Sequence, residues 1–302
     1  MEWQASAGAL GERRNDAQEE GCAMSRTWLI TGGSQGLGKA LVLAALSAGD
    51  RVVVTSRRPE KLNSLQAEHP ERLMAVALDV TSPSDARDVV ATAVEQFGSI
   101  DVLVNNAGYA TSGSIEDFPE DEFRAQVEAN LYGVVNLTRA VLPVMRGRRS
   151  GHIVQISSIG GRVGGTPGLS AYQTAKFAVE GFSEVLANEV APFGVKVTIV
   201  EPGGIRTGWA AGAAEPSGPV TSDYEETVGA WLATFAEYAG NEPGDPDRMA
   251  RAVIGAVEAA KPPRRLLLGS DALEIAISAE EARLAEAREW AEVSRSTDYP
   301  TA

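Results

Sequence analysis

The chain has 302 residues, of which 44% are hydrophobic, so it is long enough to form one large α/β domain with a substantial core. Its formal net charge of -14 argues against a nucleic-acid partner, because phosphate binding needs clustered Lys and Arg and the sequence has no such run. The sequence has a single cysteine, Cys22, so an internal disulfide is excluded, and its two histidines, His69 and His152, are too far apart in the sequence to suggest a metal site. No apolar run reaches about 18 residues, which argues against a membrane span.

The N-terminal segment, residues 1–23, is polar and glycine-rich, has no hydrophobic period and lacks the apolar core of a signal peptide. We expect this segment to be disordered and the protein to be cytoplasmic. The main folded domain is predicted to span residues 24–270, and the motifs described below predict that it binds a dinucleotide and carries the catalytic residues. Residues 271–302 are predicted to form a charged helix and tail.

A glycine-rich turn follows the first predicted strand, residues 27–31. Glycine allows a tight turn and a close backbone approach, and the helix that follows presents N–H groups to a pyrophosphate. A dinucleotide site is therefore favoured over a plain structural turn. The turn consists of Gly32, Gly33, Ser34, Gln35, Gly36, Leu37 and Gly38.

The second predicted strand, residues 51–56, ends without the carboxylate that would bind the ribose 2′-OH of NAD. Arg57 and Arg58 follow it, and Asp50 stands at the strand's other end, far from the crevice. A guanidinium at Arg57 suits the 2′-phosphate of NADP, which favours NADP(H) and leaves NAD(H) possible. The alternative is that both arginines are solvated loop charges.

A third strand, residues 74–78, leads to Asp79 and Val80, which could also begin a simple turn. An apolar stripe in the next segment predicts a helix that packs on the sheet, over residues 86–97. A fourth strand, residues 102–104, ends at four small or amide residues, Asn105, Asn106, Ala107 and Gly108. The asparagine side-chain amides can form hydrogen bonds with neighbouring backbone groups, and the small side chains leave space for a cofactor.

Two helices are predicted next, over residues 120–131 and 134–148, with Asn130 near their junction. An asparagine there breaks the regularity of the helix, and its side chain could cap the second helix. The residues alone leave that structural role and a functional role open.

Residues 152–156 predict a buried strand that ends at Ser157 and Ser158, where a hydroxyl can reach a ligand in the crevice. A helix follows and carries Tyr172 and Lys176 one turn apart on one face. An ammonium beside a phenol is expected to lower the phenol's pKa from about 10, so that Tyr172 can exchange a proton near neutral pH. Such a pair can be plain surface neighbours, but the serine and the glycine turn favour catalysis.

The C-terminal third begins with a strand at residues 195–201 and a loop at residues 202–207, which contains Pro202, Gly203, Gly204, Ile205, Arg206 and Thr207. A mobile loop (208–221), helices (224–239 and 246–260), a strand (265–268) and a charged helix (272–294) are predicted to follow. Residues 208–260 are expected to form a substrate loop and lid, with an apolar stripe that could also be ordinary core: Val228, Trp231, Leu232, Phe235 and Tyr238. Alternating strands and helices predict a single Rossmann-like α/β domain with a doubly wound parallel sheet of about seven strands.

These motifs resemble the short-chain dehydrogenase/reductase family over roughly residues 25–210, and the arginine after the second strand suits its NADP-preferring carbonyl reductases. The resemblance implies that Asn130, Ser158, Tyr172 and Lys176 form a catalytic tetrad. It implies that Asp79 and Val80 lie beside the adenine. The residues implied to hold the rest of the dinucleotide are Gly32, Ser34, Gln35, Gly36, Leu37, Gly38, Arg57, Asn106, Ala107, Gly108, Tyr172, Lys176, Pro202, Gly203, Ile205 and Thr207.

The implied activity is hydride transfer between NADPH and a carbonyl compound or secondary alcohol, with Tyr172 as general acid. We expect a hydrophobic small-molecule substrate of unnamed identity, and the resemblance implies a homo-oligomer, either a dimer or a tetramer. Two alternatives remain. An NAD-dependent epimerase or dehydratase would carry a different glycine spacing, and a non-catalytic NADPH sensor would lack the serine or the tyrosine.

Overall fold

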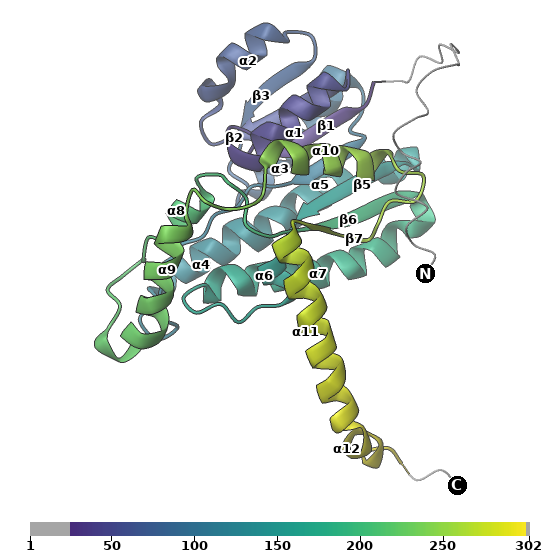
Figure 1. The fold of residues 1–302 in the computed structure, drawn as a ribbon. Helices are drawn as coiled ribbons and strands as arrows, with labels where there is room; N and C mark the ends of the chain where they lie inside the picture. Colours follow the sequence, from purple (N-terminus) through teal and green to yellow (C-terminus); the bar gives the residue numbers. More distant parts are fainter. Residues whose placement is uncertain (1–24, 300–302) are drawn as a thin grey trace, which may run out of the picture.

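Seven runs of β-branched and other apolar residues form the parallel sheet that the sequence predicts, in the order β3-β2-β1-β4-β5-β6-β7. The computed structural model describes residues 25–299, and the predictions for residues 1–23, Cys22 included, lie outside them. Figure 1 shows helices covering both faces of the sheet. The doubly wound α/β prediction is confirmed.

The strands are β1 Thr27–Thr31, β2 Arg51–Ser56, β3 Leu73–Ala77, β4 Val102–Asn105, β5 Gly151–Ile156, β6 Val195–Pro202 and β7 Arg265–Leu268. The helices are α1 Gly36–Ser47, α2 Asn63–Glu68, α3 Pro83–Phe97, α4 Glu120–Val127, α5 Gly133–Arg148, α6 Ile159–Arg162, α7 Ser170–Val190, α8 Trp209–Ala213, α9 Ala230–Tyr238, α10 Pro246–Glu258, α11 Ser270–Glu289 and α12 Ala291–Ser296.

Successive strand residues feed two different cores, because side chains alternate between the faces of a sheet. Trp28 and Ile30 of β1 belong to the core under α1 and α10, whereas Leu29 between them belongs to the core under α3, α5 and α7. All three side chains are fully buried. The sheet is therefore covered on both faces, as its near-continuous apolar strands require.

The crevice lies where the chain changes direction across the sheet. From β3 at one edge the chain returns to β4 beside β1, so the carboxyl ends of β1 and β4 are neighbours from which the chain turns to opposite sides. Ligands of open α/β sheets bind at this switch point. It brings together the loop after β1 and the loop after β4, which the sequence identifies as candidate cofactor loops.

Several predicted boundaries were wrong. The helices predicted on either side of Asn130 are joined by a π-helical turn, Glu128–Tyr132. The loop predicted over residues 208–221 contains α8, and the helix predicted from residue 224 begins with a 3₁₀ turn and a π-helical turn before α9. The last helix is interrupted at Trp290. Tertiary contacts override the local glycine, alanine and proline composition in these segments.

Helix α11 extends away from the body of the molecule and carries α12 at its far end (Figure 1). Within residues 25–299, no helix has both the length and the apolar character needed to cross a bilayer. The same part of the chain holds no group of three or more His, Cys, Asp or Glu side chains arranged for a metal ion.

Candidate active site

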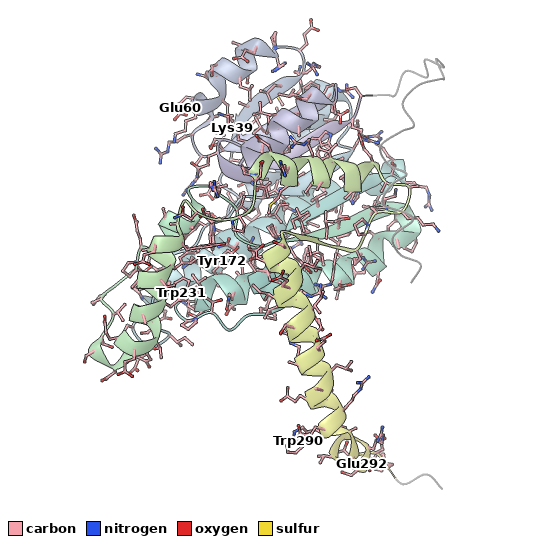
Figure 2. All side chains as sticks on the ribbon, in the orientation of Figure 1. Lys39, Glu60, Tyr172, Trp231, Trp290 and Glu292 are labelled. Atoms are coloured by element: carbon pink, nitrogen blue, oxygen red, sulfur yellow. The ribbon has the colours of Figure 1, made fainter. Side chains whose placement is uncertain are left out.

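A cavity of about 840 Å³ runs along the carboxyl edge of the sheet, and every candidate site residue predicted from the sequence lines it. Its wall is made by loops that follow β1, β2, β3, β4, β5 and β6, together with α7, α8, α9 and the start of α11. In Figure 2, Tyr172 and Trp231 lie close to one another on its catalytic side, and Lys39 and Glu60 lie toward the opposite end of the molecule.

The glycine turn is held directly against the loop after β4. Backbone N–H groups of Asn106 and Ala107 each donate to Thr31 Oγ1 at 3.0 Å, and Asn106 Nδ2 donates to the oxygens of Thr31 and Gly32 at 2.9 and 3.2 Å. A Cβ at Gly38 would overlap the Gly32 oxygen and the Asn106 amide, so no larger residue fits. The Asn106 side chain thus fixes the shape of the turn.

The N-terminus of α1 lines the cavity, and no described side chain caps its first N–H groups. Its N-cap residue, Gln35, makes no side-chain capping bond, and its first turn carries no acidic residue. Gly32 and Gly36 have φ values of 67° and 54°, which keep the turn tight and leave space for a ligand. This cradle fits a pyrophosphate, since helix N-termini bind anions.

The end of the cavity beside β2 is cationic. Arg57, Arg58 and Lys61 are exposed there and line the cavity, beside a 3.2 Å contact between the hydroxyls of Ser34 and Ser56. Asp79 also lines this end, and its Oδ1 accepts hydrogen bonds from the backbone and side chain of Thr81. The turn that the sequence allowed at Asp79 is therefore present in the cavity wall.

Ser158, Tyr172 and Lys176 meet at the opposite end. Lys176 Nζ is buried, donates to the Ile156 oxygen at 2.7 Å and lies 5.7 Å from the centroid of the Tyr172 ring. Ser158 Oγ accepts from the backbone of Gly160 at 3.0 Å and stands at the N-terminus of α6. The lysine therefore ties α7 to the end of β5, which brings the tyrosine to the serine.

Burial, and not the neighbouring Lys176, determines the direction in which the pKa of Tyr172 shifts. Burial raises the pKa of Tyr172 to about 12, although the neighbouring Ser158 hydroxyl acts in the opposite direction. Burial also lowers the pKa of Lys176 to about 8, which the carboxylate of Glu180 opposes. The expected lowering of the Tyr172 pKa is therefore wrong for this structure, and the phenol is neutral and protonated near pH 7.

Asn130 is fully buried in the π-helical turn and faces the same cavity. Its amide donates to the oxygens of Tyr109 and Gln126 at 2.9 Å, and its Oδ1 accepts from the Tyr109 backbone at 3.2 Å. A Cβ at Gly108 would overlap Asn130 Oδ1 and would lie 3.8 Å from Lys176 Nζ. Asn130 thus holds the loop after β4 and stands near the lysine.

A buried ion-pair cluster lies behind the candidate catalytic side chains. Arg265 of β7 binds the carboxylates of Glu180 on α7 and Glu201 on β6, whose side chains are 7% and 0% exposed. Glu201 also binds Arg162 of α6 at 2.9 Å, and Glu180 accepts from Ser157 at 2.7 Å. Residues from β6, β7, α6 and α7 and the residue that follows β5 are therefore joined through charged hydrogen bonds.

Aromatic side chains cover the catalytic end. Trp209 of α8 lies 4.9 Å from the Tyr172 ring and 6.4 Å from Phe235, and Trp231 stacks on Phe235 at 4.6 Å. Trp209, Trp231 and Phe235 are half-buried and line the cavity. Val228, from the same predicted stripe, is buried. The stripe thus combines packing with a wall of the cavity.

A sequence model described as short chain dehydrogenase matches residues 26–217, more than half of the chain. The chain belongs to the short-chain dehydrogenase family. Oxidoreductase BOA17 of Botryotinia fuckeliana (strain B05.10) is 49% identical over 272 residues, which are 90% of this chain and 98% of that protein. This short-chain dehydrogenase is accordingly an oxidoreductase.

Solved structures share its architecture. A short-chain dehydrogenase from Streptomyces avermitilis has 44% sequence identity and a TM-score of 0.85, covering 91% of this chain and 100% of that one. ElxO, solved with NADP bound, has 26% identity and a TM-score of 0.69, covering 83% of this chain and 100% of that one.

Sequence reasoning missed several residues of this dehydrogenase's cavity, among them Lys61, Tyr109, Glu242, Asp271 and Ile275. Lys61 comes soon after Arg57 and Arg58, and Tyr109 directly follows Gly108. Their closeness in sequence to these predicted site residues could have identified them. Asp271 follows the carboxyl end of β7, an edge that faces the crevice in parallel sheets, although it was assigned to the tail. Glu242 stands in a loop with no local signal.

Replacing Arg265 should destabilise the protein because it strands two buried carboxylates. We expect Arg265→Met to lower the free energy of unfolding by about 3–5 kcal/mol. Burial already raises the pKa of Glu180, so protonation should relieve the stranded charges, and the loss should be greater at pH 8 than at pH 5.

The matched control is Arg264→Met, whose ion pair with Glu184 has both side chains 40% exposed. It should change stability by less than about 1 kcal/mol. Denaturant titrations of both variants at the two pH values provide the measurement. Equal losses of unfolding free energy in the two variants would contradict the conclusion that the buried cluster stabilises the protein more than the exposed ion pair does.

Proposed function

We propose that this protein is an NADP-dependent reductase that transfers a hydride from NADPH to the carbonyl carbon of a hydrophobic substrate. One observation carries the proposal: Ser158, Tyr172 and Lys176 converge in the same cavity that holds the glycine turn and the free N-terminus of α1. The candidate proton donor and the candidate dinucleotide site thus lie in one cavity. The protein supplies orientation and a proton, and NADPH, when bound, supplies the hydride.

The cradle supports a dinucleotide along the whole edge of the sheet. Gly32, Gly36 and Gly38 would approach the pyrophosphate, and Asp79 and Val80 would lie at the adenine. Asn106, Ala107 and Gly108 would pass beneath the ligand. Pro202, Gly203, Ile205 and Thr207 would hold the nicotinamide end, and Ser34, Gln35 and Leu37 would complete the turn. Small residues and positive φ values at the turn support this assignment.

The catalytic end favours the reductive direction. Ser158 would donate a hydrogen bond to the carbonyl oxygen, and Tyr172 would give its proton to that oxygen as negative charge develops. A phenol with a pKa near 12 keeps its proton at neutral pH and can still protonate an alkoxide. Lys176 would hold the ribose and supply positive charge, and Asn130 would link the lysine toward solvent.

Tyr172→Phe should keep the fold and the binding of cofactor while removing the transferable proton. We expect kcat to fall by about 10²–10⁴-fold, the usual contribution of a positioned acid. Tyr132→Phe is the matched control, since Tyr132 is 48% exposed. Steady-state kinetics and NADPH titrations test the pair. A Tyr172→Phe enzyme that retains more than about a tenth of kcat, a loss below ~1.4 kcal/mol, would rule out Tyr172 as the acid.

Arg57 carries the preference for NADP. It lines the cavity beside Ser34 and Ser56, at the end of β2 where an NAD enzyme would place an acid. Among residues 25–299 it has no carboxylate within 4 Å, so its guanidinium is free to pair with a phosphate.

We expect the unmodified enzyme to have a higher kcat/KM for NADPH than for NADH, and Arg57→Asp to abolish or reverse that order. The added carboxylate repels a 2′-phosphate and can accept from a ribose hydroxyl. Arg87→Asp, an exposed change on α3 away from the cavity, controls for net charge. Equal use of both cofactors by the unmodified enzyme would end the NADP assignment.

The aromatic wall points to a bulky apolar substrate. Trp209 packs on Tyr172 itself, and Trp231 and Phe235 extend the same surface along α9. Aromatic groups at the acid would exclude water and hold a large carbonyl compound. We therefore propose that α8 and α9 form a cover over the substrate end of the cavity.

Trp209→Ala and Trp231→Ala should each reduce kcat/KM for a large aromatic ketone more than for a small aliphatic one. Lost contact area affects the large substrate selectively. Trp290→Ala, at the far end of α11 (Figure 2), should leave both substrates unaffected because Trp290 is 58% exposed. Equal losses on both ketones, with a lower melting temperature, would show that the wall is only core packing.

A further inference from the structure

The substrate end of the cavity contains two carboxylates that each keep one oxygen without a partner. Glu242 and Asp271 line the cavity, Glu242 is 1% exposed, and its Oε1 and Asp271 Oδ1 are buried with no hydrogen-bond donor among residues 25–299. Backbone N–H groups satisfy the other oxygens, from Gly240 to Glu242 Oε2 at 2.9 Å and from Gly204 to Asp271 Oδ2 at 2.7 Å. Each carboxylate is thus fixed in place and incompletely bonded.

The surrounding cations do not neutralise this pair. Arg206 donates to the backbone oxygen of Glu242, at 3.1 and 2.9 Å, and its guanidinium is committed there. No described Lys, Arg or His lies within 4 Å of either carboxylate, in contrast to Glu180 and Glu201 in the ion-pair cluster. A buried carboxylate oxygen without a donor lacks the hydrogen bonds that water would give it, which is unfavourable. A cationic ligand with N–H groups would donate the missing hydrogen bonds to these two oxygens.

The aromatic side chain of Tyr238 lies beside the loop that binds Asp271. The Tyr238 hydroxyl lies against Gly204, where any Cβ would overlap it, and the Tyr238 ring lies 5.9 Å from that of Phe235. The same Gly204 donates its N–H to Asp271 Oδ2, and the N–H of Asn241, the residue before Glu242, donates to the Tyr238 backbone oxygen. Tyr238 therefore lies beside Asp271 and close in the chain to Glu242, and burial, followed by the charges of Asp271 and Glu242, raises its pKa. Carboxylates beside aromatic faces form a favourable environment for an ammonium group, because both attract positive charge.

We propose that Tyr238, Glu242 and Asp271 form a subsite for a protonated primary amine on the substrate. The preferred substrate is then a carbonyl compound with an apolar body against Trp209, Trp231 and Phe235 and an ammonium group in this corner. The inference rests on the proposed reductase function and deepens it. Arg57, Arg58 and Lys61 give the opposite end of the cavity the opposite charge, so an ammonium is directed to the substrate end.

The test compares two ketones of matched size, of which only the second carries an amine: 4-(4-ethylphenyl)butan-2-one and 4-[4-(aminomethyl)phenyl]butan-2-one. We expect the full-length enzyme with NADPH to have a higher kcat/KM for the amine at pH 7. Glu242→Gln should lower the ratio of the two kcat/KM values at least about tenfold, since it removes the charge of a buried carboxylate that faces the amine. Glu237→Gln, an exposed change on α9 away from the cavity, should keep the ratio.

A second measurement is independent of turnover of the amine. 2-Phenylethylamine should inhibit reduction of the neutral ketone more strongly than 2-phenylethanol does, and Glu242→Gln should abolish the difference. Asp271→Asn, which keeps an acceptor for the Gly204 N–H, serves if Glu242→Gln lowers the melting temperature.

The outcomes separate the two proposals. An enzyme that reduces the neutral ketone but shows no preference for the amine, or whose ratio is unchanged in Glu242→Gln and Asp271→Asn, would overturn the amine subsite alone. An enzyme that reduces neither ketone, nor any of a wider panel of carbonyl compounds, would overturn the proposed function itself.

Discussion

The contacts of Arg265 are the interaction on which the geometry of the active site depends. This one side chain holds two buried carboxylates, Glu180 and Glu201, and each of them reaches a different part of the site. Glu180 accepts from Ser157, the residue before Ser158, and Glu201 directly precedes Pro202, the last residue of β6, after which the proposed nicotinamide loop continues. If Arg265 were absent, the two carboxylates would leave unbalanced negative charge beside Ser158, α7 and that loop.

Arg265 lies beyond the segment that matches the family model, residues 26–217. The final strand therefore does more than extend the sheet at its edge. Arg162 of α6 binds both Glu201 and Glu280 of α11, and Arg283 donates to the backbone oxygens of Arg162 and Val163. The turn after Ser158 is thus held from β6 on one side and from α11 on the other.

Local patterns in the sequence predicted the sheet and the glycine turn before α1 because both are encoded by short runs. The β-branched stretches, the glycine turn and the pair Tyr172 and Lys176 each lie within one or two adjacent elements. The ion-pair cluster could not be found in this way, since Glu180, Glu201 and Arg265 come from α7, β6 and β7. The pKa of Tyr172 depends on its burial under Trp209, which no spacing reveals. The expected homo-oligomer stays a prediction.

The π-helical turn at Asn130 fixes the rotational phase of everything that follows it. Removing one residue to restore a regular helix would rotate α5 by about 100° relative to α4. Leu137, Val141 and Met145, now fully buried against the sheet, would then face another direction. The hydrophobic core therefore preserves the irregular turn, and a substitution elsewhere in α5 cannot straighten it. The packing of the hydrophobic core and the position of Asn130 therefore depend on the same number of residues in this turn.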